Sequence, residues 1–361
     1  MDTTAQGQNQ SPDQLQTILE KVKNANLPSD LLQAITERIE RIALLKNTTG
    51  GTGSSNYFIE LEAVLTYTNW IIGLPWDKTT TEILDINQAK KVLDENHYGL
   101  QGVKDHILEY LASIILNTKN STLENISHAP ILCLVGLAGT GKTTLASSIA
   151  QSLGRTFERI PFGGMGSAQA LRGQSRAFAD AEPGLVIKKL VHAKNKNCVI
   201  LLDELDRVSE AVRGDIMGVL IELLDPEQNR AFLDHYIDYP FDLSRVLFVT
   251  TANNTTNIST AVLDRLEVIQ MPSYSDEEKE MIGKNYLFPK IRTEAGLSQS
   301  HLTIDDSLWP TIIRPLGFDS GIRSLERTIN GICRKVARLI VEGKAQMIHV
   351  DNTNLKQFLP T

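Results

Sequence analysis

Residues 136–143 read Gly-Leu-Ala-Gly-Thr-Gly-Lys-Thr and follow the pattern G-x-x-x-x-G-K-[ST]. Glycines at such positions let the backbone wrap closely around a phosphate, so that N–H groups and a helix N-terminus point at the anion. Lys142 would bring a mobile positive charge to the outer phosphates, and Thr143 would offer a hydroxyl to magnesium. The pattern therefore predicts a phosphate-binding P-loop. The alternative is a glycine-rich turn that carries a surface lysine.

The segments on either side of this loop favour the P-loop interpretation. Residues 131–135 form an apolar run that is typical of a buried parallel strand, and residues 144–153 have the apolar spacing of a helix. A strand, a glycine-rich turn and a helix are the context that a P-loop needs. We expect ATP to bind here, and the residues predicted to hold it are Gly136, Leu137, Ala138, Gly139, Thr140, Gly141, Lys142, Thr143 and Thr144.

A second motif lies downstream, where the apolar residues 199–202 are followed by Asp203 and Glu204. Asp203 would hold Mg²⁺ together with Thr143, largely through water, and Glu204 would polarise the water that attacks the γ-phosphate. The alternative is a strand that simply ends in two solvated acids. Together with the P-loop, the motif predicts hydrolysis of Mg-ATP.

Three further residues are candidates for catalysis. Asn253 follows the apolar strand-like run Val-Thr-Thr-Ala and could orient the attacking water, or it could merely open a loop. Arg265, in Leu-Asp-Arg-Leu-Glu-Val, is either a solvated charge at a helix end or a cation aimed at a neighbour's phosphates. Arg323, in Gly-Ile-Arg-Ser-Leu-Glu-Arg, opens an amphipathic helix and could reach a nucleotide between two domains.

The spacing of apolar residues divides the chain into four predicted parts. Residues 1–12 are rich in Gln, Thr and Asn and are expected to be a disordered tail. Residues 13–90 carry helical patterns, with a flexible linker at 47–55. Residues 91–272 alternate strand and helix, which favours an α/β nucleotide-binding domain with a parallel sheet, and residues 273–361 form a mostly helical domain. The strands expected in the sheet are 131–135, 157–160, 198–202, 246–250 and 267–271.

Composition narrows the class of partner. The net charge is −7 and no dense basic block occurs, so nucleic acid is not favoured as a partner. No apolar run approaches the length of a membrane span, and the N-terminus lacks the apolar core of a signal peptide. Cys133, Cys198 and Cys333 are odd in number and show no C-x-x-C spacing. We therefore expect buried thiols, no membrane association and a cytoplasmic location.

The order of these elements resembles that of the AAA+ ATPases: a P-loop, a DE strand, a TTAN strand, a DR element and a helical domain with a GxR turn. Several phrases strongly resemble the ATPase portion of the Lon proteases, and the resemblance runs from about residue 15 to the end of the chain. These phrases are Asn96-His-Tyr-Gly-Leu100, Ile107-Leu-Glu-Tyr-Leu-Ala112, Leu224-Asp-Pro-Glu-Gln-Asn229, Phe232-Leu-Asp-His-Tyr236, Pro240-Phe-Asp-Leu-Ser244 and Leu263-Asp-Arg-Leu-Glu-Val-Ile269.

The resemblance implies a P-loop AAA+ module with a parallel five-stranded sheet, preceded by a helical segment and followed by a helical lid. It also implies a homo-oligomeric ring, a hexamer, with ATP at the subunit borders. On this interpretation Asn253 is the first sensor, Arg265 is an arginine finger that acts on the next subunit's ATP, and Arg323 is the lid sensor within the same subunit.

The resemblance further places His97, Tyr98 and Gly99 near the adenine. Residues 176–180 fall where the family carries the loop that grips substrate in the central pore, with Phe178 and Ala179 as the gripping pair. Family members usually have a large aliphatic residue where this chain has Ala179, so we expect a weaker grip. The alternative for Phe178 is a side chain packed in the core.

The chain also departs from the family. A full Lon has a substrate-binding domain before the helices and a serine–lysine peptidase domain after the lid. Neither is recognisable here, so we expect no peptidase activity from this chain alone. The Gly-Phe-Asp-Ser of residues 317–320 also replaces the family's Arg-Glu-Ala wording.

We interpret the chain as a Lon-like AAA+ ATPase that couples ATP hydrolysis to remodelling, unfolding or translocation of unfolded or misfolded proteins. One alternative is the ATPase half of a split or truncated Lon protease that works with a separate peptidase. Another is a nucleotide-gated binding or regulatory module with little turnover.

Overall fold

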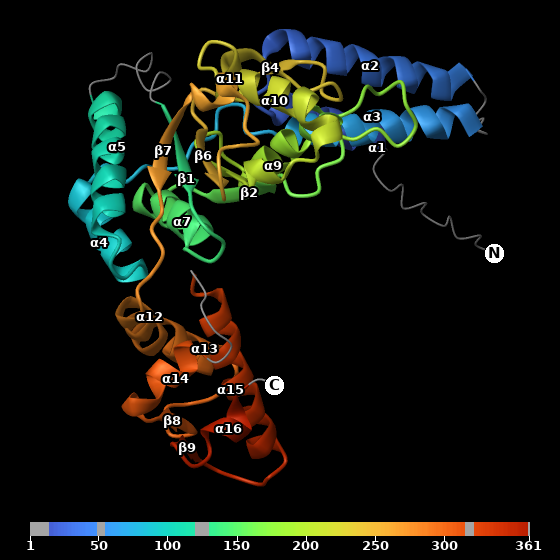
Figure 1. The fold of residues 1–361 in the computed structure, drawn as a ribbon. Coiled ribbons are helices and arrows are strands. Elements are labelled where there is room, and N and C mark those ends of the chain that lie inside the picture. The colour runs from blue at the N-terminus through green and yellow to red at the C-terminus, as the bar shows by residue number, and fades with distance from the viewer. Residues whose placement is uncertain (1–13, 49–54, 120–129, 315–320, 360–361) are drawn as a thin grey trace, which may run out of the picture.

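The structure, a computed structural model, describes residues 14–48, 55–119, 130–314 and 321–359. The predicted disordered tail and most of the predicted linker at 47–55 lie outside the described residues. Three bodies follow one another along the chain: a group of three helices, a sheet covered by helices, and a small, mostly helical domain (Figure 1). Among the described residues, none of the helices combines the length and the apolar character that crossing a bilayer requires.

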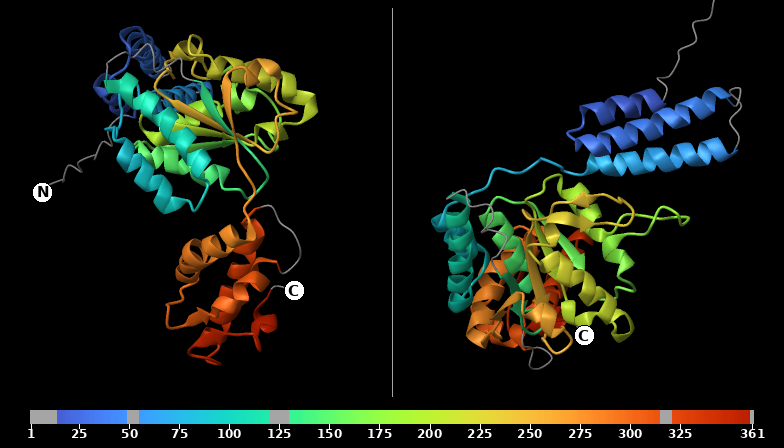
Figure 2. Two further views of the ribbon diagram at one scale, coloured as in Figure 1. Left: turned by 60° about the vertical axis from the view of Figure 1, so that its left-hand side comes forward. Right: turned by 90° about the horizontal axis from the view of Figure 1, so that it is seen from above.

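Three long helices lie side by side at the N-terminal end and project away from the sheet (Figure 2). They are α1 (Gln14–Asn24), α2 (Ser29–Thr48) and α3 (Ser55–Gly73). The first helix buries Leu15, Ile18 and Val22, whose spacing of three and four residues puts them on one helical face. Residues 31, 35, 39 and 42 form the matching buried stripe of α2. We call α1–α3 the helical arm.

The second body is built on a parallel five-stranded sheet in the order β2-β3-β6-β1-β7. Its strands are β1 (Ile131–Val135), β2 (Phe157–Pro161), β3 (Val199–Asp203), β6 (Leu247–Ala252) and β7 (Leu266–Gln270). Every residue of β3 and β6 is buried, as expected for strands covered on both faces. The predicted α/β fold with a parallel five-stranded sheet is confirmed.

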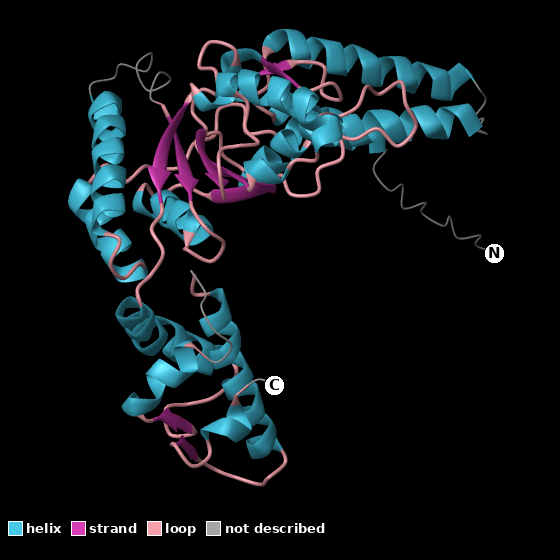
Figure 3. Ribbon diagram, in the orientation of Figure 1, coloured by secondary structure: helices cyan, strands magenta, loops and turns pink. Residues whose placement is uncertain are grey.

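Helices cover both faces of this sheet (Figure 3). Along β1, Leu132 and Leu134 pack into the core that contains α4, α5 and α7, while Cys133 and Val135 pack into the core that contains α9 and α10. The alternation follows from the two-residue period of a strand. The helices are α4 (Ile86–Asn96), α5 (Gln101–Lys119), α7 (Lys142–Ser152), α8 (Gln169–Arg172), α9 (Leu185–Ala193), α10 (Glu210–Leu224) and α11 (Thr260–Leu263).

Two features of this body differ from the sequence-based expectation. The predicted domain boundary at residue 90 falls inside α4, which Asp85 caps and whose Ala89 is buried in the core shared with α7 and the sheet. A short antiparallel hairpin of β4 (Phe232–Leu233) and β5 (Pro240–Phe241) was not expected. Strands of two residues show no periodicity from which they could be recognised.

The third body is a lid domain with its own core around Trp309 and Ile329, both almost fully buried. It begins at α12, where Ser275 and Glu278 form a reciprocal capping box. A parallel two-stranded ribbon, β8 with β9, closes it. Its elements are α12 (Asp276–Ile282), η3 (Gly283–Leu287), α13 (Phe288–Glu294), β8 (Leu302–Ile304), η4 (Asp306–Leu308), α14 (Trp309–Ile313), α15 (Arg323–Val341), β9 (Ile348–Val350) and α16 (Leu355–Phe358).

Candidate active site

The loop between β1 and α7 has the backbone that a phosphate cradle requires. Gly139 and Gly141 have positive φ angles of 83° and 90°, which residues with a side chain rarely adopt. At Gly136 a Cβ atom would lie 2.7 Å from the Cβ of Met271. Only glycine fits at these positions, and the backbone N–H groups of the loop stay accessible to an anion.

Lys142 lies folded across this loop. Its Nζ donates to the carbonyls of Gly136 at 2.6 Å and Leu137 at 3.0 Å, and to Oδ1 of Asn253 at 3.2 Å. The residue is 8% exposed, and within the described part of the chain its ammonium has no ion pair. Burial lowers the pKa of this ammonium, against the opposing charge of nearby carboxylates, Asp206 first. A buried cation held only by neutral oxygens, beside a glycine cradle, suits a phosphate group.

Asp203 ends β3 and is 3% exposed. Its Oδ2 accepts from both Nε and Nη2 of Arg159 at 2.6 Å, and its Oδ1 accepts from the hydroxyl of Thr251. Charge-assisted hydrogen bonds of this kind fix a carboxylate in place. The Asp203 carboxylate therefore stands at the carboxyl end of the strand next to β6, where a hard cation could use it.

Glu204 leaves the strand in a left-handed conformation with φ of 62°. Its N–H donates to Oγ1 of Thr251 at 2.9 Å, and its carboxylate lies 3.2 Å from Arg207. Left-handed backbone is strained for a glutamate, and such strain concentrates at functional sites. The turn leaves the Glu204 side chain about one-third exposed, at 32%, so water reaches it.

Asn253 joins these groups because β6 lies between β1 and β3 in the sheet. It accepts from Lys142 through Oδ1, while its backbone N and Nδ2 donate to the buried carboxylate of Asp206 at 3.0 and 3.3 Å. The carboxyl ends of three neighbouring strands thus bring Lys142, Asn253 and the Asp203–Glu204 pair together. Asp206 and Arg159 were not predicted as site residues from the sequence. The only signal for Asp206 was that a third acid follows two residues after the Asp-Glu pair.

Arg265 is not part of this group. It immediately precedes β7, and its carbonyl accepts from the N–H of Ile131, the first residue of β1. Its guanidinium donates to Oδ2 of Asp225 at 3.0 Å and to the carbonyl of Ala261 at 2.7 Å. Because the P-loop follows the carboxyl end of β1, Arg265 lies about one strand length, roughly 15 Å, from the P-loop of its own chain.

The N-terminal end of α15 brings the lid onto the P-loop. The N–H of Ile322 donates to the carbonyl of Gly139 at 3.0 Å. A Cβ at Gly321 would lie 2.5 Å from the carbonyl oxygen of Ala138, so only glycine allows this approach. Arg323, the first residue of α15, is exposed beside the loop. A Cβ at Gly139 would lie 3.2 Å from the Cβ of Arg323, so this lid arginine begins directly beside the phosphate cradle.

A cavity of about 390 Å³ opens between the P-loop helix α7, the end of α4 and the lid. Its lining includes His97, Tyr98 and Thr144 from the sheet domain and Tyr286 from the lid, and the Tyr98 and Tyr286 rings pack edge to face at 6.4 Å. Next to it Gly99 has φ of 63°. The volume and the aromatic walls suit a nucleobase.

His97 gives this cavity a dependence on pH. Burial, and then the charge of Lys104, lower its pKa from 6.5 to about 4, and its Nε2 is hydrogen bonded to Ser148 Oγ at 2.9 Å. The pKa of His97 is lower in the folded protein than in the unfolded chain, so its contribution to stability is fully present above pH 6.5. That contribution is lost as the pH falls from 6.5 towards 4. We expect the free energy of unfolding to fall by about 2 kcal/mol from this residue between pH 7 and pH 5.

Chemical denaturation of the wild type and of His97→Gln at the two pH values measures this effect. Glutamine keeps a polar partner for Ser148 and does not titrate, so the variant should show the smaller fall. Equal falls in both proteins would contradict the assigned pKa.

Phe178 lies on the loop between α8 and α9 and is 67% exposed. Ala179 is exposed as well. The exposure excludes the alternative that Phe178 is packed in the core. A large aromatic side chain held out into solvent is available to a partner.

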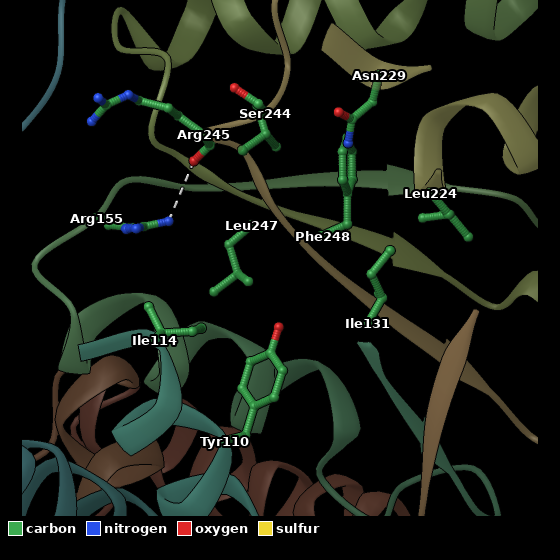
Figure 4. A pocket seen from close by; sticks show the side chains of 11 residues that line it. Tyr110, Ile114, Ile131, Arg155, Leu224, Asn229, Ser244, Arg245, Leu247 and Phe248 are labelled. Atoms are coloured by element: carbon green, nitrogen blue, oxygen red, sulfur yellow. Dashed lines mark hydrogen bonds between the residues drawn. The ribbon is translucent and has the colours of Figure 1, made fainter. Parts of the chain in front are cut away.

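A second cavity, of about 50 Å³, lies at the other end of the strands (Figure 4). Ile131 and Leu247, the first residues of β1 and β6, line it together with Tyr110, Arg155 and Asn229. The Tyr110 hydroxyl points into it, and Oδ1 of Asn229 has no hydrogen-bond partner among the described residues. A space of this size and polarity accommodates water and is too small for a nucleotide.

Comparison with known proteins agrees with this geometry. The family described as "ATPase family associated with various cellular activities (AAA)" matches residues 132–274, and the one described as "Lon protease AAA+ ATPase lid domain" matches residues 293–348. The chain belongs to the Lon family, in its AAA+ ATPase portion. The predicted family, and with it the predicted Lon-type ATPase region, is confirmed.

Similar proteins include Lon proteases from several organisms. The Lon protease of Lawsonia intracellularis is 41% identical over 347 residues, which are 96% of this chain and 40% of that protein. The Lon protease of Syntrophomonas wolfei is 42% identical over 94% of the chain and 40% of its own length. That of Desulfatibacillum aliphaticivorans is 44% identical over 83% of the chain and 36% of its own length. The chain thus spans about 40% of the length of such relatives.

Proposed function

We propose that this chain binds and hydrolyses Mg-ATP and uses the energy to unfold or thread polypeptides. The observation that carries the proposal is the meeting of Lys142, Asn253 and the Asp203–Glu204 pair at the carboxyl ends of three adjacent strands. This is the place where ligands of open α/β sheets bind. The matches to the AAA ATPases and to the Lon lid support the same activity.

In this mechanism each residue has a separate task. The P-loop glycines and Lys142 bind the phosphates, and Thr143 with Asp203 would hold Mg²⁺. Bound Mg-ATP supplies the γ-phosphoryl group that passes to water. Glu204 accepts a proton from that water, and Asn253, held by Asp206, orients it. His97 and Tyr98 would enclose the adenine, with Gly99 beside them.

The assembly and the substrates are part of the proposal. We infer a homo-hexameric ring in which Arg265 of one subunit acts on the ATP of its neighbour, while Arg323 acts on the ATP of its own subunit. Unfolded or misfolded proteins are the proposed substrates, gripped by Phe178. Because the relatives are proteases of which the chain spans about 40%, a peptidase that receives the threaded protein is the natural partner. The cytoplasmic location stays a prediction from the sequence.

Phe178→Ala tests the threading activity. The side chain is 67% exposed, so we expect the melting temperature and the basal ATPase rate to stay close to those of the wild type. Stimulation of the ATPase by unfolded casein should disappear, because the aromatic group that presses on the polypeptide is gone. Phosphate release with and without casein measures both rates.

Met347→Ala is the matched control, since Met347 is equally exposed, at 67%, but lies in the lid. It should keep full stimulation. Retained stimulation in Phe178→Ala would remove Phe178 from substrate contact. A large fall in melting temperature, with both rates lowered together, would instead assign it a structural role.

A further inference from the structure

The β4–β5 hairpin carries a motif that the ATPase chemistry does not use. Residues 232–244 include two of the phrases that resemble the Lon proteases, yet none of them enters the nucleotide site described above. The hairpin loop, residues 234–239, instead contacts two other parts of the chain. One is the loop that presents Phe178, residues 173–184, and the other is the helical arm.

On the first side, the hairpin loop closes the base of the Phe178 loop. Asp234 is fully buried, and its Oδ2 accepts from the N–H of Gly184 at 2.7 Å. At the opposite end of the Phe178 loop, a Cβ at Gly173 would lie 2.8 Å from Oδ1 of Asp234. The N–H of His235 also donates to the carbonyl of Arg172 at 2.7 Å. The buried carboxylate of Asp234 therefore contacts both ends of the Phe178 loop, while the tip of that loop stays exposed to solvent.

On the second side, the hairpin loop is attached to α3 of the helical arm. Tyr67 is 6% exposed, and its hydroxyl donates to the carbonyl of Ile237 at 3.1 Å. The ring of Tyr67 also packs near that of Tyr236, with centroids 6.2 Å apart. Nearby, the hydroxyl of Tyr239 donates to the carboxylate of Asp30 at the start of α2.

Arg176 joins the three parts directly. It lies two residues before Phe178, and its guanidinium carbon is 4.1 Å from the centroid of the Tyr67 ring. The same guanidinium forms an ion pair with Asp238 of the hairpin loop at 3.5 Å. A cation over a largely buried aromatic ring makes a directional contact that restricts both groups.

We propose that the hairpin loop is a bracket that fixes the base of the Phe178 loop to the helical arm, with Asp234, Arg176 and Tyr67 as positioning residues. The inference rests on the proposed function of Phe178. On a flexible loop, a gripping residue would be displaced when the substrate resists. The movement driven by ATP would then deform the loop and would not be transmitted to the polypeptide. Held by the bracket, the base of the loop keeps its place while the exposed tip engages polypeptide.

The first test uses Arg176→Met and Tyr67→Leu in the full chain. Each should lower casein stimulation of the ATPase by about tenfold or more, because small misplacements of a working group carry costs of that order or larger. Basal ATPase should stay close to wild type. The double variant should lose less stimulation than the two single losses combined, since the two changes share the contact between Arg176 and the Tyr67 ring.

Arg38→Met is the matched control. Arg38 of α2 also lies near the Tyr67 ring, at 5.8 Å, but it belongs to the arm itself and not to the Phe178 loop. Its removal should leave stimulation unchanged. A loss equal to that of Arg176→Met would overturn the bracket, because the effect would then come from the arm alone.

A second measurement reports the restraint itself. A nitroxide attached through Phe178→Cys reports the motion of the loop, since the three native cysteines are buried. Adding Arg176→Met, or the milder Asp234→Asn, should give a spectrum of a more mobile label. An unchanged spectrum overturns the bracket, whatever happens to stimulation.

The two proposals can fail separately. If Phe178→Ala abolishes stimulation while Arg176→Met and Tyr67→Leu retain it, the bracket is wrong and the proposed function stands. If Phe178→Ala itself retains stimulation, Phe178 does not grip the substrate, and the bracket, which rests on that role, falls with it.

Discussion

Glu204→Gln should bind ATP as tightly as the wild type and hydrolyse it about 10²–10⁴ times more slowly, the usual effect of losing a general base. Glutamine has nearly the shape of glutamate but cannot take a proton from water. The phosphate cradle around Lys142 belongs to a different strand end and is left intact. A fluorescent ATP analogue measures binding, and phosphate release measures turnover.

Two control variants accompany this experiment. Lys142→Ala should lose binding itself, because the buried cation that faces the phosphates is removed. Glu210→Gln changes an exposed glutamate in the first turn of α10 by the same chemistry and should leave both quantities unchanged. Turnover in Glu204→Gln equal to the wild type would refute the role of Glu204.

Arg265→Ala should lower turnover by about 10³–10⁵, the range found for arginine fingers in P-loop enzymes. The reason is positional: Arg265 lies at the amino end of the sheet, and the P-loop of the same chain follows the carboxyl end. From there it does not reach the nucleotide site of its own chain, so the role proposed for it is on the site of another subunit. Specific activity of the wild type should rise with protein concentration as the ring assembles.

Mixing variants gives the sharper measurement. Arg265→Ala keeps Glu204, and Glu204→Gln keeps Arg265, so a mixture should recover turnover that neither protein has alone. Arg245→Ala is the control, because Arg245 is an exposed arginine at the same end of the sheet. Full activity in a dilute, demonstrably monomeric sample, or no recovery in the mixture, would contradict action between subunits.

Local sequence was sufficient for much of this fold. Buried parallel strands appear as apolar runs, so β1 was predicted at its observed bounds and β3 within one residue of its observed ends. The P-loop could be predicted because its glycines answer a local backbone requirement at positions such as 139 and 141.

Contacts between distant parts of the chain could not be predicted from local sequence. Nothing local to Arg159 indicates that it would pair with Asp203, 44 residues away. The part of Asp234 is equally hidden, because its partner Gly184 is 50 residues away and the hairpin strands have only two residues each. The boundary predicted at residue 90 falls inside α4. The burial of Ala89 in the core shared with α7 depends on tertiary contacts that local sequence does not show.

The cavity that would take the nucleobase has a lid wall that packs on two hydrophobic cores. Ile282 of the lid is buried in the core of the sheet, whereas Leu287 packs against both that core and the core around Trp309. The width of the cavity therefore depends on how the lid packs on the sheet, so the cavity works as an adjustable aperture. A substitution deep in the lid, at Gly283 against the Trp309 ring for example, would tilt one wall and change nucleotide affinity without touching the nucleotide.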